Sequence, residues 1–221
     1  MNIWKAAIFD LDGVVVDTAK YHFLAWRQLA KELGFEFTEK DNERLKGVSR
    51  MESLEILLAV GNMKNIPLKK KQNLAEKKNE WYKEYLYDMT PAEILPGVKD
   101  FMQHLRLKGI KTALASASKN APIILNKLNI TDFFDVIIDG NSVSKAKPDP
   151  EVFLKAAEKL VIQPSECVVF EDAQAGVEGA KRAGMQVVGI GKSEILQKAD
   201  TVVNGFAAMK PSTLFHHIEK L

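Results

Sequence analysis

Short apolar runs alternate with helix-length segments along most of the chain. Five of these runs have the length and composition of strands buried on both faces of a parallel sheet. The five runs lie at 6–9, 111–115, 136–138, 167–170 and 187–190. A helix is predicted before each of the last four apolar runs. Two of these helices cover 98–109 and 150–160, and the other two end at about 128 and about 184. Such alternation predicts right-handed crossovers and a parallel sheet.

Residues 18–88 lack this alternation and predict helices only. Asp17 or Thr18 is a suitable N-cap for the first helix, which Gly34 should end. Further helices are predicted at 41–45, from about 50 to 61, and at 67–87. Because the strand at 6–9 precedes this block, the block must be an insertion. The sequence therefore predicts an α/β, Rossmann-like parallel-sheet core over 1–16 and 90–221 with an inserted all-helical cap domain over 17–89.

Composition and charge narrow the class of protein. The 221 residues are 46% hydrophobic and 27% charged, which is typical of a globular chain. A net charge of +2 argues against nucleic acid or an acidic membrane as a partner. The basic run 69–71 is followed by Glu76 and Glu80, so we interpret it as a solvated helix face. With neither a signal-peptide pattern nor an apolar span near the ~20 residues of a membrane helix, we expect a cytoplasmic protein.

The single cysteine, Cys167, cannot form an internal disulfide. It lies within the apolar run at 167–170. We therefore expect a small buried core residue rather than a nucleophile.

Polar residues follow four of the predicted elements, where a parallel sheet presents its carboxyl edge. They are Asp10 and Asp12, Ser116 and Ser118, Lys147, and Glu171 with Asp172. In open α/β sheets, ligands bind beyond the carboxyl ends of the strands. The structural alternative is that these residues only cap helices and form turns, as a lone Asp-x-Asp commonly does. Four polar ends converging on one edge favour a functional site.

These residues together resemble the four motifs of the haloacid dehalogenase-like superfamily of phosphoryl-transfer enzymes. The motifs are Asp10-Leu11-Asp12-Gly13-Val14, Ser116, Lys147-Pro148 and Glu171-Asp172. Further similarity at 18–23, 45–50, 113–120 and 171–176 points to the mutase branch of that superfamily. The resemblance extends from about Ala6 to Gly191, and the tail beyond Gly191 carries little signal.

The resemblance implies a role for each motif. Asp10 would be the nucleophile that forms an aspartyl phosphate, and Asp12 the general acid and base. Ser116 would donate a hydrogen bond to the transferring phosphoryl group, and Lys147 would supply positive charge. The implied cofactor is Mg²⁺, a cation that prefers oxygen ligands. Its expected ligands are Asp10, the backbone carbonyl of Asp12, Glu171 and Asp172.

The implied substrate-binding residues lie in the cap and in the loop after Ser116. They are His22, Lys46, Gly47, Val48, Ser49, Arg50, Lys78, Ala117, Ser118 and Asn120. Arg50 is expected to bind the second phosphate of a bisphosphate, because an arginine is unfavourable at the helix start predicted there. Structural alternatives remain open: a solvated Arg50, a packed or exposed His22, a charged helix face for Lys78 and a helix cap for Asn120.

The implied activity is that of a Mg²⁺-dependent sugar phosphomutase that uses a bisphosphate intermediate. A sugar-phosphate phosphatase is the alternative within the superfamily. A catalytically silent anion-binding protein is a third possibility, against which the intact Asp10, Asp12, Lys147 and Asp172 argue. The expected partners are small-molecule sugar phosphates, with no nucleic acid or membrane, and we expect a monomer.

Overall fold

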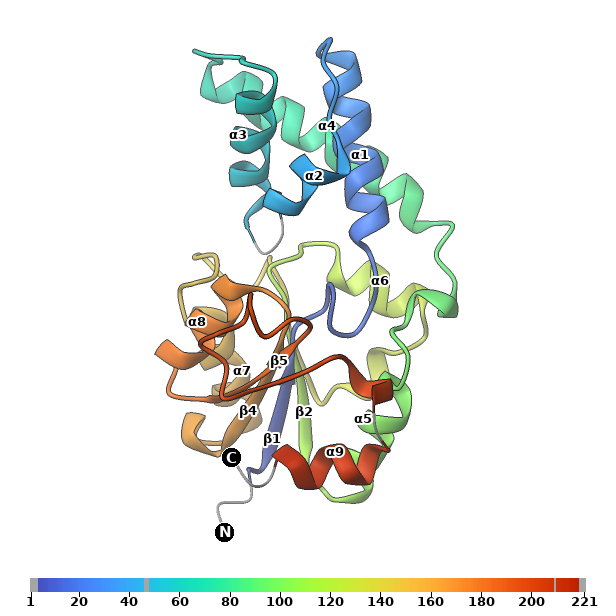
Figure 1. Cartoon of the computed structure of the whole chain (residues 1–221), viewed down its shortest axis with the longest axis vertical. Coiled ribbons are helices and arrows are strands. Elements are labelled where there is room, and N and C mark those ends of the chain that lie inside the picture. The colour runs from blue at the N-terminus through green and yellow to red at the C-terminus, as the bar shows by residue number, and fades with distance from the viewer. Residues whose placement is uncertain (1–3, 46–47, 209, 219–221) are drawn as a thin grey trace. The chain divides into compact units, whose positions relative to one another are not determined.

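A computed structural model describes residues 4–45, 48–208 and 210–218. The chain divides into two compact units, residues 1–17 with 90–221 and residues 18–89. We call the first the sheet unit and the second the helical unit. Figure 1 is coloured by residue number and shows which parts of the chain form each unit. No helix among the described residues has the length and apolar character needed to cross a bilayer.

The sheet unit is built on six parallel strands in the order β3-β2-β1-β4-β5-β6. The strands are β1 (Ala6–Phe9), β2 (Lys111–Ala115), β3 (Val136–Ile138), β4 (Cys167–Glu171), β5 (Gln186–Ile190) and β6 (Thr201–Val203). The predicted parallel α/β sheet is therefore confirmed, and β6 is an edge strand that the sequence pattern did not predict.

Helices cover both faces of this sheet. They are α5 (Val98–Leu107), α6 (Ala121–Lys127), α7 (Glu151–Leu160), α8 (Gln174–Arg182) and α9 (Pro211–Ile218). Helices α7 and α8 pack together on one face, whereas α5 and α9 lie on the other (Figure 1). Short 3₁₀ turns are η2 (Pro91–Glu93), η3 (Thr131–Phe133), η4 (Pro164–Glu166) and η5 (Phe206–Ala208).

The central strand β1 is buried on both faces. Ile8 belongs to the apolar cluster under α7 and α8, together with Phe153. On the opposite face the ring of Phe9 stacks on Phe170 at 4.6 Å, and Phe170 meets Phe101 of α5 edge-on at 5.5 Å. Each fully buried side chain of this size contributes about 1.5–3 kcal/mol. This burial fixes the end of β1 and therefore the position of Asp10, which is the next residue in the chain.

Every regular element among the described residues of the helical unit is a helix. The elements are α1 (Ala19–Glu32), α2 (Glu39–Asn42), the 3₁₀ turn η1 (Glu43–Leu45), α3 (Arg50–Val60) and α4 (Leu68–Leu86). Their apolar faces meet in one cluster that includes Trp26, Leu29, Leu54 and Leu57. This unit therefore has a hydrophobic core of its own.

Candidate active site

Asp10 stands directly after β1, and its backbone N–H donates to the carbonyl of Phe170 at 3.0 Å. The chain then turns sharply at Gly13, whose φ is +85°. A Cβ at Gly13 would lie 2.1 Å from Oδ2 of Asp172, so only glycine lets this turn approach the end of β4 so closely. The glycine thus brings the first acidic motif against the last one.

Lys147 lies at the centre of the site. Its Nζ is 2.5 Å from Oδ1 of Asp10 and 2.6 Å from Oε1 of Glu171. All three side chains are buried, with exposed fractions of 4%, 11% and 1% for Lys147, Asp10 and Glu171. The Nζ also lies 5.0 Å from the ring centroid of Phe153. Three of the sequence motifs therefore meet within hydrogen-bonding distance.

The charges of this group shift its protonation equilibria. Burial alone would lower the pKa of Lys147, but the carboxylates of Asp10 and Glu171 outweigh it and raise that pKa above lysine's usual value. Burial raises the pKa of Glu171, and the charge of Asp10 adds to the effect, although Lys147 opposes it. Burial, followed by the charges of Glu171 and Asp10, raises the pKa of Asp172 to about 8. The site therefore holds more buried negative charge than Lys147 alone offsets.

The carboxylate of Glu171 has both oxygens engaged. Oε1 accepts from Lys147, and Oε2 accepts from the N–H of Ala173 at 2.9 Å. Gly176 of α8 makes room for it, since a Cβ there would lie 1.7 Å from Oε1 of Glu171. Gly176 ends the 171–176 stretch of similarity, but the sequence alone did not assign it this role. In this arrangement the carboxylate of Glu171 is an ion-pair partner of the Lys147 ammonium group.

The side chains near Asp172 are carboxylates, whose oxygens are of the kind that divalent cations take as ligands, and their mutual repulsion contributes to the raised pKa of Asp172. Among the residues that the structure describes, however, no group of three His, Cys, Asp or Glu side chains is arranged to hold a metal ion. Asp10, Glu171 and Asp172 are the side chains that could hold a cation, and Lys147 donates to one oxygen of Asp10 and to one of Glu171.

The loop after β2 is held by its own hydrogen bonds. Oγ of Ser116, which is 1% exposed, accepts from the N–H of Ser118 at 3.0 Å. Oγ of Ser118 accepts from the N–H of Asn120 at 3.2 Å. Asn120 occupies the N-cap position of α6, but its side chain makes no capping hydrogen bond. Ser118 thus shapes the loop, while Ser116 keeps its hydroxyl hydrogen to donate and Ala117 is exposed at the surface.

A second loop supports this one and was missed from the sequence. Gly140, after β3, donates from its N–H to the carbonyl of Ser118 at 3.1 Å, and a Cβ there would lie 2.2 Å from the carbonyl oxygen of Ala117. The buried carboxylate of Asp139 accepts from the N–H groups of Asn141 and Ser142. Asp139 therefore fixes the backbone against which the Ser116 loop rests.

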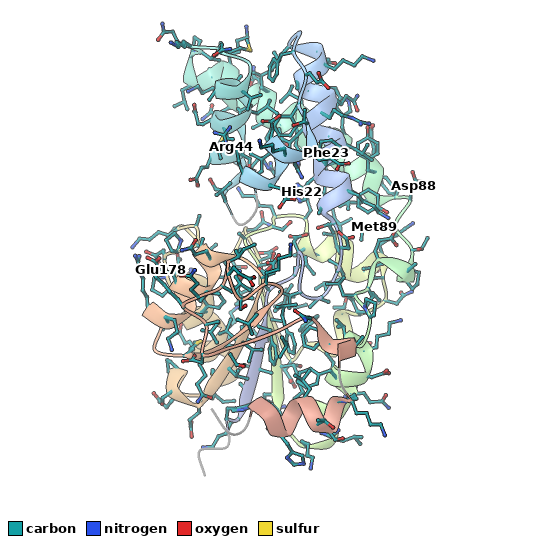
Figure 2. All side chains as sticks on the ribbon, in the orientation of Figure 1. His22, Phe23, Arg44, Asp88, Met89 and Glu178 are labelled. Carbon is teal, nitrogen blue, oxygen red and sulfur yellow. The ribbon has the colours of Figure 1, made fainter. Side chains whose placement is uncertain are left out.

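The helical unit contains a second cluster of predicted residues. Nζ of Lys78 on α4 lies 2.9 Å from Nδ1 of His22 on α1. Because an ammonium group only donates, Nδ1 must accept, which places the His22 proton on Nε2. The ring of His22, labelled in Figure 2, stacks on Tyr82 at 4.1 Å. Burial, then the charges of Lys78 and Arg50, lowers the pKa of His22 well below its usual value.

Arg50 is the first residue of α3, as its predicted position required. Its Nη2 donates to Oδ1 of Asn79 at 2.8 Å, and its Nη1 lies 3.3 Å from Oε2 of Glu76. These partners on α4 supply a local reason for an arginine at a helix start, which the sequence could not show. Its side chain remains 28% exposed.

The other predicted residues of the helical unit are Val48 and Ser49, with Lys46 and Gly47. Val48 and Ser49 are partly exposed, and Oγ of Ser49 caps α3 by accepting from the N–H of Glu52 at 3.3 Å. Lys46 and Gly47 lie outside the described residues. In the sheet unit, Cys167 is buried as expected, and burial raises the pKa of its thiol to about 12, which makes it a poor nucleophile.

Known proteins share both the sequence and the fold. The family model of the haloacid dehalogenase-like hydrolases matches residues 4–184. The β-phosphoglucomutase of Bacillus subtilis is 46% identical over 200 residues, which is 90% of this chain and 88% of that protein. The phosphorylated carbohydrates phosphatase of Thermotoga maritima is 33% identical, covering 98% of this chain and 99% of that one.

A solved structure agrees with the first of these relatives. The crystal structure of β-phosphoglucomutase from Clostridium difficile matches with a TM-score of 0.91 at 41% identity. The match covers 99% of this chain and 98% of that one. The similarity therefore includes both the sheet unit and the helical insertion.

Proposed function

The chain belongs to the haloacid dehalogenase-like hydrolase family, and we propose that it is a β-phosphoglucomutase that interconverts β-glucose 1-phosphate and glucose 6-phosphate. The observation that carries this proposal is the 46% identity to the B. subtilis enzyme over 90% of the chain. The buried group of Asp10, Lys147 and Glu171 provides the chemistry that such an activity needs.

Asp10 is the nucleophile of the proposed reaction. As an aspartyl phosphate, it is attacked by the free 6-hydroxyl of β-glucose 1-phosphate, whose proton goes to Asp12, and the products are the 1,6-bisphosphate and the free Asp10 carboxylate. The bisphosphate then turns round, and the carboxylate of Asp10 attacks the phosphorus at position 1 while the leaving sugar oxygen takes the proton back from Asp12. This step releases glucose 6-phosphate and restores the aspartyl phosphate, so no phosphate is lost.

Positive charge and hydrogen bonds must offset the charge of the phosphoryl group beside Asp10. Lys147 is already held against Asp10 and, with its raised pKa, stays protonated across the physiological range. The hydroxyl of Ser116 donates to the same group. Mg²⁺, held by Asp10, Asp172 and the carbonyl of Asp12, with Glu171 close by, would neutralise further phosphoryl charge when bound.

The helical unit, residues 18–89, is the proposed cap, whose start the sequence placed one residue earlier, at 17. Its contribution is to exclude water from the aspartyl phosphate and to bind the sugar phosphate that is not transferred. Arg50 has the planar geometry for a second phosphate, and its fork lies beside Asn79 and Glu76. Lys46, Gly47, Val48, Ser49, His22 and Lys78 are proposed as its other substrate contacts.

Two products measured on the same samples test the proposal. The enzyme with Mg²⁺, β-glucose 1-phosphate and a trace of β-glucose 1,6-bisphosphate should form glucose 6-phosphate, detected by a coupled dehydrogenase. Free phosphate should stay near background. Phosphate release that equals substrate loss, without glucose 6-phosphate, would contradict the mutase and favour the sugar-phosphate phosphatase, the activity named for the T. maritima relative.

A further inference from the structure

The loop that carries Lys147 is tied to the first turn of α7 by one carboxylate. Oε2 of Glu151 accepts from the N–H of Ser144 at 3.0 Å, from its hydroxyl at 2.9 Å and from the N–H of Lys145 at 2.8 Å. These two backbone groups lie three and two residues before Lys147. One side-chain oxygen thus fixes the approach of the chain to the buried amine.

The same carboxylate is itself held in place. Its Oε1 accepts from Nζ of Lys155, one helical turn further along α7, at 2.6 Å. Lys155 also donates to the carbonyl of Ser142 at 2.8 Å. Lys155, then the N–H of Lys145 and the donors of Ser144, hold the pKa of Glu151 at about 2, so it stays ionised at any working pH.

The loop is fixed on its other side as well. Oδ1 of Asp149 accepts from the N–H of Glu151 at 3.0 Å, and the N–H of Asp149 donates to the carbonyl of Ala146 at 3.0 Å. Phe153, two residues into α7 and fully buried, places its ring below Nζ of Lys147. Lys147 therefore extends from a loop whose two ends converge on the start of one helix.

We propose that Glu151 is a positioning residue for Lys147: by accepting the Ser144 and Lys145 N–H groups it sets where the amine lies relative to Asp10 and Glu171. The inference rests on the proposed function only in that Lys147 must assist phosphoryl transfer. Misplacing a charged group by about 1 Å costs up to ~100-fold in rate. Glu151→Ala should therefore lower kcat by about 10- to 100-fold and leave KM nearly unchanged.

A conservative variant distinguishes two roles of Glu151: accepting hydrogen bonds from the backbone N–H groups and carrying a negative charge. Glu151→Gln can keep an oxygen towards Ser144 and Lys145 while losing the ion pair with Lys155. It should retain kcat within about 2-fold of wild type, because an ion pair that is still partly open to solvent contributes little. A Gln variant as slow as the Ala variant would overturn the proposal that holding the backbone is what matters.

A double-mutant cycle tests whether Glu151 acts through Lys147. Single-turnover transfer from β-glucose 1,6-bisphosphate is measured for wild type, Glu151→Ala, Lys147→Met and the double variant. If Glu151 acts only by placing the amine, Glu151→Ala should change the rate by less than about 2-fold once Lys147 is gone. Equal losses in both backgrounds would overturn the inference.

Asp200→Ala is the matched control. Asp200 also accepts from one backbone N–H, that of Val187 at 2.7 Å, and from the Nζ of Lys181 at 2.7 Å, but it lies between β5 and β6. It should lower the melting temperature and leave kcat unchanged in both backgrounds. A kcat loss equal to that of Glu151→Ala would assign Glu151 to general stability and overturn the inference.

The cycle also separates the inference from the function on which it rests. A Lys147→Met enzyme as fast as wild type would overturn the proposed role of Lys147, and the inference with it. A slow Lys147→Met enzyme in which Glu151→Ala remains fully additive would overturn the inference alone.

Discussion

Lys147 Nζ lies 2.5 Å from Oδ1 of Asp10, although 137 residues separate the two in the sequence. The same amine holds Glu171 at 2.6 Å, so a single buried cation joins the ends of β1 and β4. A lysine with two carboxylate partners is costly to bury without function, because desolvation of the ions offsets most of their attraction. The proposed phosphoryl transfer gives this arrangement a purpose.

Removing the cation should affect both rate and stability. Lys147→Met keeps most of the side-chain volume but leaves two buried carboxylates without their partner. Breaking a buried pair in this way costs roughly 3–5 kcal/mol, and the free energy of unfolding at pH 7 should fall by that order. Urea denaturation together with the mutase assay checks the prediction. A variant as stable and as active as wild type would contradict the proposed role of Lys147 in the site.

Two glycines of α8 provide a matched pair. In Gly176→Ala the new Cβ would overlap the carboxylate of Glu171, which must then leave Lys147. In Gly179→Ala the nearest side-chain atom, on Phe153, is 3.3 Å away, and alanine favours a helix over glycine by about 1 kcal/mol. We expect Gly176→Ala to lose at least ~10-fold in kcat while remaining folded. Gly179→Ala should stay near wild type, and similar losses in both would contradict this role for Gly176.

The His22 environment predicts a pH dependence of stability. The folded pKa is lowered while the unfolded value stays near 6.5, so below 6.5 the unfolded chain binds more protons. Stability from this group is therefore complete above about pH 6.5 and is lost as the pH falls, by at most about 1.4 kcal/mol per pH unit.

Denaturation at several pH values between 4 and 8 measures this effect. His22→Gln should be less sensitive to acid than wild type over that range. His104→Gln is the comparison: the pKa of His104 is lowered less than that of His22, so the same linkage predicts a smaller decrease in acid sensitivity for His104→Gln than for His22→Gln. An unchanged pH slope in His22→Gln would show that His22 is free to protonate in the folded protein.

Arg50→Ala should separate recognition by the cap from the phosphoryl chemistry. If Arg50 binds the phosphate that is not transferred, its loss should weaken use of sugar phosphates by roughly 2–5 kcal/mol. Acetyl phosphate, which carries no second phosphate, should still phosphorylate Asp10 at nearly the wild-type rate. Free phosphate release should also rise relative to isomerisation, because water reaches the aspartyl phosphate more often.

Lys71→Ala is the control for Arg50, since it removes another cation of the same unit, paired with Glu55 at 2.6 Å. It should leave both reactions unchanged. If Arg50→Ala lowered the rates with acetyl phosphate and with sugar phosphate equally, Arg50 would have only a structural role through its contacts with Asn79 and Glu76.

The strands that carry the site were predictable because they are buried on both faces. Residues 6–9 form an uninterrupted apolar run, and Asp10 marks its end. Strand β6 escaped prediction because its three residues, Thr201–Val203, form a short and partly exposed edge. Parallel strands end at a common edge, which is why Asp10, Lys147 and Glu171 could be expected near one another.

What the sequence could not show is which partners each side chain takes. Glu171 is expected to share the metal with Asp172, and the structure adds two partners that the sequence did not predict, Lys147 for one oxygen and the N–H of Ala173 for the other. Arg50 was expected to bind a second phosphate because a cation is unfavourable at a helix start, and the sequence could not show that Glu76 and Asn79, 26 and 29 residues further on, contact its guanidinium group. Such contacts depend on packing between helices, which periodicity within one helix does not specify.

Phosphorus NMR in ¹⁸O-enriched water tests the mutase reaction most directly. The enzyme is given Mg²⁺, β-glucose 1-phosphate and a trace of β-glucose 1,6-bisphosphate, with Asp10→Asn as the inactive control. The glucose 6-phosphate signal should replace that of β-glucose 1-phosphate, with no isotope shift from ¹⁸O and with inorganic phosphate at background. Growth of an ¹⁸O-shifted inorganic phosphate signal in place of glucose 6-phosphate would contradict the mutase and identify a hydrolase.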